Sequence, residues 1–455
     1  MQSERQVNEN ALQARTLIVG LGKTGLSCVR FLSARGLPVA VVDSRDQPPG
    51  LEVLRAELPG VALFTGGFDK AAFDAADRLI VSPGVSVRQP MIQAAVARGV
   101  ELIGDIELFA RHARHPIVAI TGSNGKSTVT AMLAAMASAC GKRAGVGGNF
   151  GTPALDLLDQ DVELYILELS SFQLETTDSL TPVAASVLNI SADHMDRYTG
   201  IDDYALAKQR IYRHAGQRVF NRDDAAVMAM TVGDGQASYF TLGVPASDAQ
   251  FGLREQAGAQ WLAKGGDLLM AVGELPLPGL HNQANALAAL ALGWAAGLSM
   301  SGMLDGLRRF RGLPHRTQYV AEIDGVRWYN DSKGTNPGAT IAALNGFADH
   351  EGRIVLIAGG QSKNADFTAL AVVARRACKA VVLFGEDAER IASVLDASRA
   401  TKRAGDLREA VALAAEQARP GDIVLLSPAC ASFDMFSGFE ARGEQFVRIV
   451  LEYQE

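Results

Sequence analysis

The stretch TGSNGKST, at residues 121–128, has the residue types of a polyphosphate-binding loop. It follows the strand-like run PIVAI, and the glycines Gly122 and Gly125 let successive backbone N–H groups face one anion. Lys126 could reach the β- and γ-phosphates of a nucleotide, and the hydroxyl of Ser127 could bind Mg²⁺. A standard phosphate loop has a glycine where this chain has Ile120, so the loop is a shortened variant. The predicted ATP site comprises Gly122, Ser123, Asn124, Gly125, Lys126, Ser127 and Thr128.

A second glycine turn, GLGKTG at residues 20–25, lies between the run TLIV and a helix-like segment. This spacing is typical of dinucleotide-binding units, in which a pyrophosphate lies at the N-terminus of the helix. Asp43 ends the next apolar run, where a dehydrogenase would bind a ribose hydroxyl. An NAD-dependent oxidoreductase therefore stays open at this point. That hypothesis explains neither the loop at 121–128 nor the last third of the chain.

Candidate metal ligands follow the predicted ATP loop. Glu168 ends the apolar run LYIL, and His194 follows the next run, AASVLNIS. A carboxylate at the end of a buried strand beside a phosphate loop is well placed to bind Mg²⁺. A single histidine is more often structural, so His194 depends on Glu168 and Lys126 lying at the same sheet edge. Lys208 follows in a helical stretch, and its spacing indicates only a surface lysine.

Polar residues also gather in the last third of the chain. The segment NDSKGTNPGAT is rich in turn-forming residues, which suits either a ligand site or a plain turn. Two loops follow strand-like runs: QSKNADF follows RIVLIAGG, and ACASFDMFSGF follows DIVLLSP. Because ligands bind at the carboxyl ends of parallel strands, these two loops could share a pocket. The candidate residues of these two loops are Lys363, Ser432, Phe433 and Phe439, and those of NDSKGTNPGAT are Asp331, Lys333, Thr335 and Asn336.

The elements that must position these residues alternate as strand, loop and helix, which predicts an α/β fold with mainly parallel sheets. We predict three domains, at residues 1–104, 105–312 and 313–455. Within the second, the Gly-rich stretch 232–279 favours short antiparallel strands. The segment RFRGLPHRTQ, at residues 309–318, is the predicted linker to the third domain because Gly and Pro lie between charged residues.

Composition excludes several other classes of protein. The 455 residues carry a formal net charge of −7, so the chain lacks the broad basic surface of a nucleic-acid-binding protein. The four cysteines form no CxxC pair, which argues against a zinc site or a disulfide framework and fits a reducing cytosol. The uncharged run 284–300 is predicted to be a buried helix rather than a membrane span. We therefore expect a cytoplasmic protein that binds no nucleic acid and does not insert into a membrane. We also expect a monomer, although composition does not bear on the oligomeric state.

Eight stretches, in order along the chain, resemble the Mur ligases, the ATP-dependent amide-forming enzymes of bacterial peptidoglycan synthesis. They are TGSNGKST, ELSSFQLE, DHMDRY, HNQANALAA, GLPHR, NDSKGTNPGAT, AGGQSKNADF and LLSPACASFDMFSGFEARG. GLGKTG and SPGV extend the resemblance to the N-terminal third, and NDSKGTN and LLSPACAS resemble the branch of the family that adds D-glutamate. The resemblance implies a Rossmann-like domain for a UDP-linked substrate, a central P-loop-type ATPase domain and a C-terminal Rossmann-like domain.

The reaction implied by this resemblance activates a carboxylate. ATP phosphorylates the L-alanyl carboxylate of UDP-N-acetylmuramoyl-L-alanine, the amine of D-glutamate attacks the acyl phosphate, and a tetrahedral intermediate expels phosphate. ATP is then a co-substrate that acts with a first and a second Mg²⁺ ion, and neither NAD nor flavin is needed. The D configuration of the glutamate rests on the resemblance alone.

The resemblance also implies roles for individual residues. The UDP-linked substrate would contact Gly22, Lys23, Thr24, Asp43, Ser44, Arg45, Ser82, Gly84 and Asn149. Beyond the loop at 121–128, ATP would contact Asn282, Asn285, Arg316 and Asp331. The metal ions would be bound by Ser127, Glu168, His194 and Lys208, the last as a carbamate formed with CO₂. D-Glutamate would be bound by Thr335, Lys363, Ser432 and Phe439, and the catalytic residues would be Lys126, His194, Lys208, His315 and Lys333.

Two alternatives besides the oxidoreductase stay open at the level of the sequence. One is a sibling ligase that adds another amino acid, such as a folylpolyglutamate synthetase-like enzyme, although NDSKGTN and SPACASFD argue against it. The other is a nucleotide-binding regulator, which would bind ATP without substrate-stimulated turnover. Sites at the junctions of three domains imply closure on binding, and RGLPHR is the predicted hinge.

Overall fold

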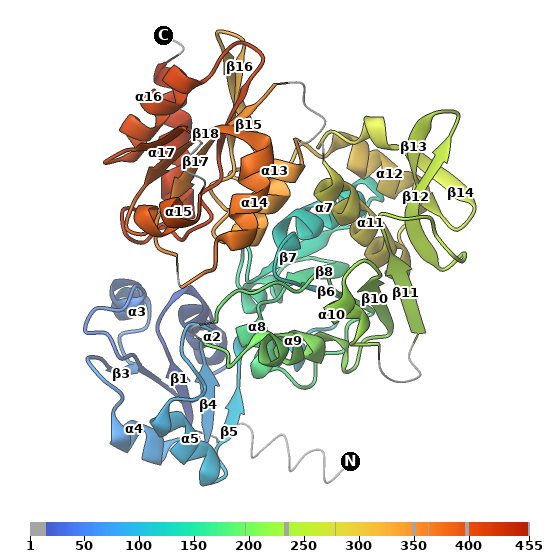
Figure 1. Cartoon of the computed structure of the whole chain (residues 1–455). Coiled ribbons are helices and arrows are strands. Elements are labelled where there is room, and N and C mark those ends of the chain that lie inside the picture. The colour runs from blue at the N-terminus through green and yellow to red at the C-terminus, as the bar shows by residue number, and fades with distance from the viewer. Residues whose placement is uncertain are drawn as a thin grey trace.

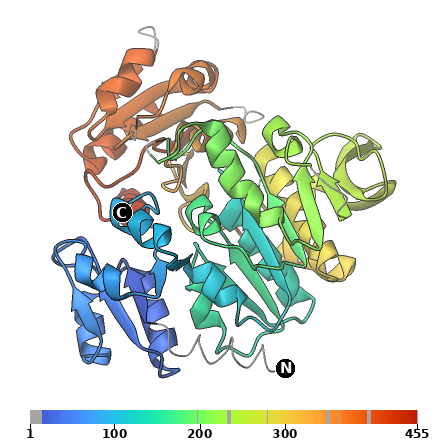
Figure 2. The same cartoon turned by 90° about the horizontal axis from the view of Figure 1, so that it is seen from below.

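Three β-sheets, each with helices packed against it, follow one another along the chain (Figure 1). The computed structural model describes residues 15–195, 197–231, 236–277, 279–347, 352–362, 364–395 and 400–453. Lys363, predicted to bind D-glutamate, lies outside the described residues. The three bodies lie around a common centre in two perpendicular views (Figures 1 and 2).

The first sheet has five parallel strands in the order β3-β2-β1-β4-β5. The chain order reverses between β1 and β4, and this switch point is where open α/β sheets bind ligands. The strands are β1 (Thr16–Val19), β2 (Val39–Val42), β3 (Ala62–Phe64), β4 (Arg78–Val81) and β5 (Glu101–Ile103). The helices are α2 (Lys23–Ser33), α3 (Leu51–Glu57), α4 (Lys70–Ala75), α5 (Pro90–Ala97) and α6 (Asp105–Ala110).

The glycine turn between β1 and α2 requires glycine for a steric reason. A Cβ atom on Gly25 would lie 2.0 Å from the carbonyl oxygen of Gly20, and Gly20 itself has a φ of +99°. Only the absence of side chains lets the helix begin this close to the strand. The turn therefore presents the N-terminus of α2 at the switch point.

The second sheet has nine strands in the order β14-β13-β12-β11-β10-β9-β6-β8-β7. Neighbours from β7 to β12 are parallel, whereas β12, β13 and β14 pair in an antiparallel way. The antiparallel strands predicted within 232–279 are therefore confirmed for residues 250–271, whereas β11, in the same stretch, is parallel to both of its neighbours. The strands are β6 (Ile117–Thr121), β7 (Ala144–Gly148), β8 (Leu164–Glu168), β9 (Ala184–Val187), β10 (Gln217–Asn221), β11 (Gln236–Phe240), β12 (Gln250–Gln256), β13 (Ala259–Lys264) and β14 (Asp267–Ala271).

Helices cover this sheet and bury its central strands. They are α7 (Lys126–Ala139), α8 (Ser171–Glu175), α9 (Ile201–Gln209), α10 (Ala225–Met228), α11 (Leu280–Ala295) and α12 (Met300–Arg309), with 3₁₀ turns η1 (Ala154–Leu157), η2 (Arg210–Tyr212) and η3 (Val272–Glu274). The helix α11 ends at Ala295, and its residues 286–293 are buried, so the prediction of a buried helix is confirmed as far as Gly293. Among the described residues, no helix is long and apolar enough to cross a membrane.

The third sheet has six strands in the order β15-β16-β20-β17-β18-β19. β15 and β16 form an antiparallel pair, and the other neighbours are parallel. The strands are β15 (Gln318–Ile323), β16 (Val326–Asn330), β17 (Ile354–Gly359), β18 (Cys378–Phe384), β19 (Ala400–Arg403) and β20 (Ile423–Leu426). The helices are α13 (Pro337–Asn345), α14 (Thr368–Ala377), α15 (Ala388–Val394), α16 (Leu407–Gln417) and α17 (Phe439–Glu452).

The first and second sheets share one hydrophobic core. Ile18 and Phe109 from the first unit belong to the same buried cluster as Leu155 and Tyr165 from the second. The third sheet has cores of its own, and residues 310–317, where the linker was predicted, contain neither helix nor strand. The predicted class, three α/β units with a mainly parallel central sheet, is confirmed. The domain boundaries at 104 and 312 stay predictions.

Candidate active site

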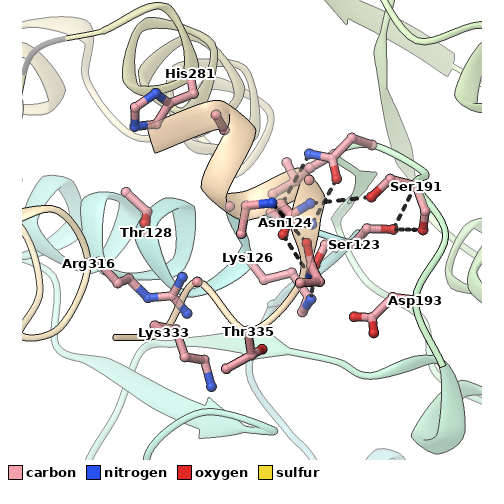
Figure 3. A pocket seen from close by; sticks show the side chains of 18 of the residues that line it. Ser123, Asn124, Lys126, Thr128, Ser191, Asp193, His281, Arg316, Lys333 and Thr335 are labelled. Atoms are coloured by element: carbon pink, nitrogen blue, oxygen red, sulfur yellow. Dashed lines mark hydrogen bonds between the residues drawn. The ribbon is translucent and has the colours of Figure 1, made fainter. Parts of the chain in front are cut away.

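A cavity of about 690 Å³ lies between the second and third sheets. Loops at the carboxyl ends of β6, β8 and β9 form one wall, and loops after β16 and β20 form another. Figure 3 shows Lys126 in the same pocket as Arg316, Lys333 and Thr335. The predicted residues that line it are Ser123, Asn124, Gly125, Lys126, Thr128, Asn149, Glu168, His194, Lys208, Asn282, Asn285, Arg316, Asp331, Lys333, Thr335, Ser432 and Phe439.

The phosphate-type loop leads into the N-terminus of α7. Gly125 precedes this helix with a left-handed φ of 82°, and Gly125 and Lys126, at the N-terminus of α7, line the cavity. The first amides of a helix have no acceptor within the helix and can bind an anion there. The ammonium group of Lys126 curls back and donates hydrogen bonds to the carbonyl oxygens of Gly122, at 2.7 Å, and Ser123, at 2.8 Å. Burial lowers the pKa of Lys126, although Glu168 and Asp193 act in the opposite direction. This arrangement suits a polyphosphate.

Glu168 is the centre of a polar cluster behind the loop. Its carboxylate accepts hydrogen bonds from Ser127 Oγ, at 2.5 Å, and from Asn149 Nδ2, at 2.8 Å. Arg316, which arrives from the linker to the third sheet, donates to Ser127 Oγ at 2.6 Å. Ser127 is 2% exposed and does not itself line the cavity. The cluster joins both walls of the site.

The donor set is compatible with Mg²⁺. The described residues contain no group of three or more His, Cys, Asp or Glu side chains that could hold a metal ion. Protein Mg²⁺ sites commonly use one or two carboxylates and complete their coordination with phosphate oxygens and water. The adjacent oxygens of Ser127 and Glu168, beside a phosphate-type loop, fit that pattern.

Lys208 is buried, which corrects the indication from its spacing that it is a surface lysine. It is 1% exposed, and Tyr204 and Ala207 of the same helix α9 are buried with it. Its Nζ donates to Thr121 Oγ1 at 3.3 Å and lies 4.6 Å from the centre of the Tyr204 ring. Burial first, and then the positive charge of Lys126, place the pKa of Lys208 well below its ordinary value. A lowered pKa favours the neutral amine, which is the nucleophilic form of a lysine side chain.

His194 lies in the loop after β9 and lines the same cavity. Its backbone is left-handed, with a φ of 57°, which is uncommon for a residue other than glycine. Its ring lies edge-on to Phe172, with 4.9 Å between the ring centres. Lys126, Glu168, His194 and Lys208 therefore all face one cavity, the arrangement on which the candidacy of His194 depended.

Lys333 and Asp331 line the wall built by the third sheet. Lys333 Nζ lies 3.7 Å from the centre of the Phe439 ring, and burial, followed by repulsion from Arg316, lowers its pKa to about 8. Asp331 accepts hydrogen bonds from Ser427 Oγ, at 2.6 Å, and from the backbone of Thr317. Burial raises the pKa of Asp331 to about 6.

His315 is the predicted catalytic residue that the structure places outside the cavity lining. It is 9% exposed, and its Nδ1 accepts a hydrogen bond from Asn330 Nδ2 at 2.9 Å. Its ring packs so close to Gly443 that a Cβ atom there would lie 2.2 Å away. The role of His315 in catalysis stays a prediction.

The residues predicted for the UDP-linked substrate, apart from Asn149, lie on the first sheet and do not line the central cavity. Asp43 accepts hydrogen bonds from Leu21 N and from the Arg45 guanidinium. Burial acts to raise the pKa of Asp43, but these donors outweigh burial and hold the pKa below its ordinary value. Ser82 Oγ donates to the carbonyl of Gly20. Gly22 precedes α2, Lys23 and Thr24 begin this helix, Ser44 lies in the loop after β2, and Gly84 lies in the loop after β4.

Lys23 is one of the residues predicted to contact the UDP-linked substrate, and this role stays a prediction. Its ammonium group donates to the carbonyl oxygen of Gly151, in a loop of the second unit, at 2.7 Å. The same loop contains Asn149, which contacts Glu168. Lys23 thus connects the glycine turn to the edge of the central cavity.

Several cavity residues were missed from the sequence. Asn189 holds the phosphate-type loop, because its side chain accepts from Asn124 N and donates to Asn124 O. Ser191 exchanges hydrogen bonds with Ser123, as Figure 3 shows. His281 lines the cavity, and burial lowers its pKa to about 4. The signal for Asn189 and Ser191 was their place directly after the apolar run AASVL, at the carboxyl end of a strand.

Family comparisons agree with this geometry. Three family models match in order along the chain: "Mur ligase MurD-like, N-terminal domain" at residues 14–104, "Mur ligase middle domain" at 120–293 and "Mur ligase, glutamate ligase domain" at 315–430. A P-loop-type unit between two further α/β units is what the sheets display. The chain belongs to the Mur ligase family.

Individual relatives are similar to this chain over nearly its whole length. The UDP-N-acetylmuramoylalanine--D-glutamate ligase of Nitrosococcus oceani is 54% identical over 440 residues, covering 96% of this chain and 97% of the relative. The enzyme of the same name from Pseudomonas fluorescens strain Pf-5 is 56% identical over 438 residues, with coverages of 96% and 97%.

Solved structures of other Mur ligases share the fold. UDP-N-acetylmuramate-alanine ligase MurC from Thermotoga maritima superposes with a TM-score of 0.62 at 20% identity, covering 97% of this chain and 100% of that one. MurF from Acinetobacter baumannii gives a TM-score of 0.61 at 17% identity, with coverages of 96% and 92%. At these identities the similarity concerns the fold alone.

Proposed function

We propose that this chain is an ATP-dependent ligase that adds D-glutamate to UDP-N-acetylmuramoyl-L-alanine in peptidoglycan precursor synthesis. The observation that carries the proposal is the identity of 54% and 56%, across 96% of the chain, with two ligases named for that reaction. The cavity supports it, because a phosphate-type loop and a second set of polar loops face one another across a space of about 690 Å³.

The chemistry requires a leaving group, because a carboxylate is a poor acyl acceptor at neutral pH. A carboxylate oxygen of the L-alanyl group attacks the γ-phosphorus of ATP, and ADP leaves. The amine of D-glutamate then attacks the acyl carbon, loses a proton, and inorganic phosphate departs as the amide forms. Lys126, Arg316 and Lys333 surround the cavity with positive charge, which stabilises the negative charge that develops on phosphate and acyl oxygens.

The metal and the carbamate belong to the same proposal. Ser127 and Glu168 would hold a first Mg²⁺, and His194 and Lys208 would serve a second; bound Mg²⁺ offsets the charge of the phosphates. The amine of Lys208 in its neutral form, which the lowered pKa favours, would add to CO₂ and release a proton, which gives a carbamate. A carbamate converts a group that would repel Mg²⁺ into an oxygen ligand.

The substrates would bind to different units of the protein. Thr335, Ser432 and Phe439 line the cavity on the side of the third sheet and would bind D-glutamate with Lys363. Asn282, Asn285 and Asp331 would contact the adenosine end of ATP. The switch point of the first sheet would bind the uridine diphosphate, because an exposed helix N-terminus accepts a pyrophosphate whatever nucleoside it bears. We also propose that the protein is a cytoplasmic monomer, which light scattering in solution tests.

The experiment that tests the function is phosphate release from ATP with UDP-N-acetylmuramoyl-L-alanine and Mg²⁺. D-Glutamate, L-glutamate, meso-diaminopimelate and L-alanine are compared as acceptors. We expect release with D-glutamate only, together with a product heavier by one glutamyl unit. Release with a different acceptor would move the protein to a sibling ligase, and no release with any acceptor would contradict the ligase assignment.

A further inference from the structure

The side chain of Arg197 connects the first unit to the loop that holds His194. Its Nη1 donates to the carbonyl oxygen of Pro83 at 2.9 Å, and its Nη2 donates to that of Val85 at 3.0 Å. Both acceptors lie in the loop after β4, whereas Arg197 follows β9 of the second sheet. The side chain is only 14% exposed, so these charge-assisted hydrogen bonds are largely shielded from water.

The guanidinium group is also held from the side of the cavity. Its carbon lies 3.9 Å from the centre of the Phe172 ring, and Glu175 Oε2 lies 3.8 Å from Nη2. Phe172 lines the cavity and packs edge-on against His194. A planar cation with two directed donors and a stacked face has little freedom to move. Arg197 therefore fixes Phe172 and, through it, the ring of His194.

The backbone gives a second connection to the same histidine. Arg197 N donates to the carbonyl oxygen of His194 at 2.9 Å, and Tyr198 N donates to it at 3.2 Å. These bonds close the turn in which His194 adopts a φ of 57°. A non-glycine residue keeps such a conformation only where its surroundings determine it. Arg197 closes this turn and anchors it to the first unit.

At its other end the connection reaches the glycine turn of the first sheet. Ser82 Oγ donates to the carbonyl of Gly20 at 2.8 Å, and Val85 N donates to the carbonyl of Ser82 at 2.9 Å. A Cβ atom on Gly20 would lie 3.0 Å from the side chains of both Ser82 and Val85. Arg197 donates to carbonyl oxygens of the loop after β4, and this loop packs directly on the glycine turn at the switch point.

We propose that Arg197 is a positioning residue that couples nucleotide binding at the switch point of the first sheet to the position of His194 in the central cavity. This inference rests on the proposed function, because it takes the switch point as the site of the uridine diphosphate. A ligand that orders the loop after β4 orders the two carbonyl acceptors. The turn of His194 then becomes better defined without any direct contact with the ligand.

The test compares Arg197→Met with Arg88→Met as the matched control. Arg88 makes the neighbouring contact between the same two units, a 2.8 Å ion pair with Asp203 that is largely exposed to water. Exposed pairs of this kind contribute little. Hydrogen–deuterium exchange with and without UDP is measured for residues 80–90 and 191–198, and kcat and KM are measured for the ligase reaction.

In the wild type we expect UDP to slow exchange in both segments. In Arg197→Met, UDP should still protect 80–90 but no longer protect 191–198, and kcat should fall about 100-fold, the effect of a misplacement near 1 Å. The KM for the UDP-linked substrate should stay within about threefold, because its own contacts are kept. Arg88→Met should match the wild type in all three quantities. Arg197→Lys, which keeps the charge but not the planar fork, should also lose most of the protection of 191–198.

The possible failures are distinguishable. If the ligase turns over normally but UDP protects 191–198 equally in Arg197→Met, the coupling is wrong and the proposed function stands. Full protection in Arg197→Lys would show that charge alone suffices and would overturn the role of the two directed hydrogen bonds. If UDP protects neither segment of the wild type, the nucleotide site on the first sheet is wrong, and the inference is overturned with it.

Discussion

Replacing Lys126 by Met separates the binding role of this lysine from any role in folding. Its ammonium group donates hydrogen bonds to two carbonyl oxygens, those of Gly122 and Ser123. Losing two charge-assisted hydrogen bonds costs about 1.5–3 kcal/mol each. Against this, burial disfavours the charged form, as the lowered pKa of Lys126 indicates, and relief of that cost is of the order of several kcal/mol. We expect the two effects to offset each other and the unfolding free energy to change by less than about 2 kcal/mol.

The effect on nucleotide affinity is expected to be much larger. A lysine about 4 Å from a phosphate charge contributes about 4 kcal/mol at an effective dielectric constant near 20, which corresponds to about 1,000-fold in Kd. A ligand at 100 times its Kd stabilises a protein by about 2.7 kcal/mol, and a 1,000-fold weaker one by less than about 0.1 kcal/mol. The stabilisation of the wild type by a non-hydrolysable ATP analogue with Mg²⁺ should therefore vanish in the variant.

Thermal unfolding with and without the analogue, supported by titration calorimetry, measures both quantities. Lys142→Met is the matched control, because Lys142 lies in the same unit but is half exposed and pairs with Glu163 at 3.2 Å on the surface. It should respond to the analogue as the wild type does. A Lys126→Met protein that binds the analogue within about fivefold of the wild type would refute the assignment of residues 121–128 as the phosphate loop.

Three further outcomes follow from burial and close packing. Lys333→Met should abolish the rise in stability that Lys333 gives the wild type between about pH 8 and pH 10.5. In that window the folded state has released a proton that the unfolded chain still holds, so the free energy of unfolding rises with pH. Thermal unfolding across this pH range measures the difference, and an unchanged profile would contradict the lowered pKa of Lys333. Gly25→Ala should destabilise the protein by about 1–3 kcal/mol or more and lower its melting temperature, because the new Cβ would lie 2.0 Å from the carbonyl oxygen of Gly20. Gly60→Ala is the control: a Cβ atom there would have no atom within 4 Å, so the melting temperature should be nearly unchanged. Wild type with ¹³C-bicarbonate should give a carbamate resonance in ¹³C NMR that Lys208→Met lacks, and its absence from the wild type would argue against carbamylation.

The fold was predictable because its signals are local. Apolar runs such as PIVAI and LYIL became the fully buried strands β6 and β8, and the glycine turns appear where the spacing put them. The antiparallel pair β15 and β16 was not foreseen. Its sequence, QYVAEIDGVRWYN, has a two-residue turn at Asp324 and Gly325 between two strand-like runs, which is a local hairpin signal.

The site was only partly predictable, because burial and distant contacts are not encoded in spacing. Nothing in the helix of Lys208 distinguishes it from a surface lysine, since its burial comes from packing against strands far away in the sequence. No sequence pattern marks Arg197 either, because both of its side-chain acceptors are backbone carbonyl oxygens more than 100 residues away. Residues such as Lys126 and Glu168 were found because a known loop pattern and a strand end mark them directly.

The two glycine turns show that a glycine motif can predict a phosphate-binding turn correctly without identifying the rest of the ligand or the reaction. At both turns a helix N-terminus approaches a strand end through glycine, so each can accept phosphate whatever the rest of the ligand. The two turns differ in the charged side chains that lie near them. The turn of the first sheet lies beside Asp43, which is neutralised by Arg45, whereas the central loop faces Lys126, Arg316 and Lys333, whose pKa values are all lowered by burial. A cavity that keeps basic groups close together is stabilised when anions enter it. That is the electrostatic requirement of a reaction between a nucleoside triphosphate and carboxylates.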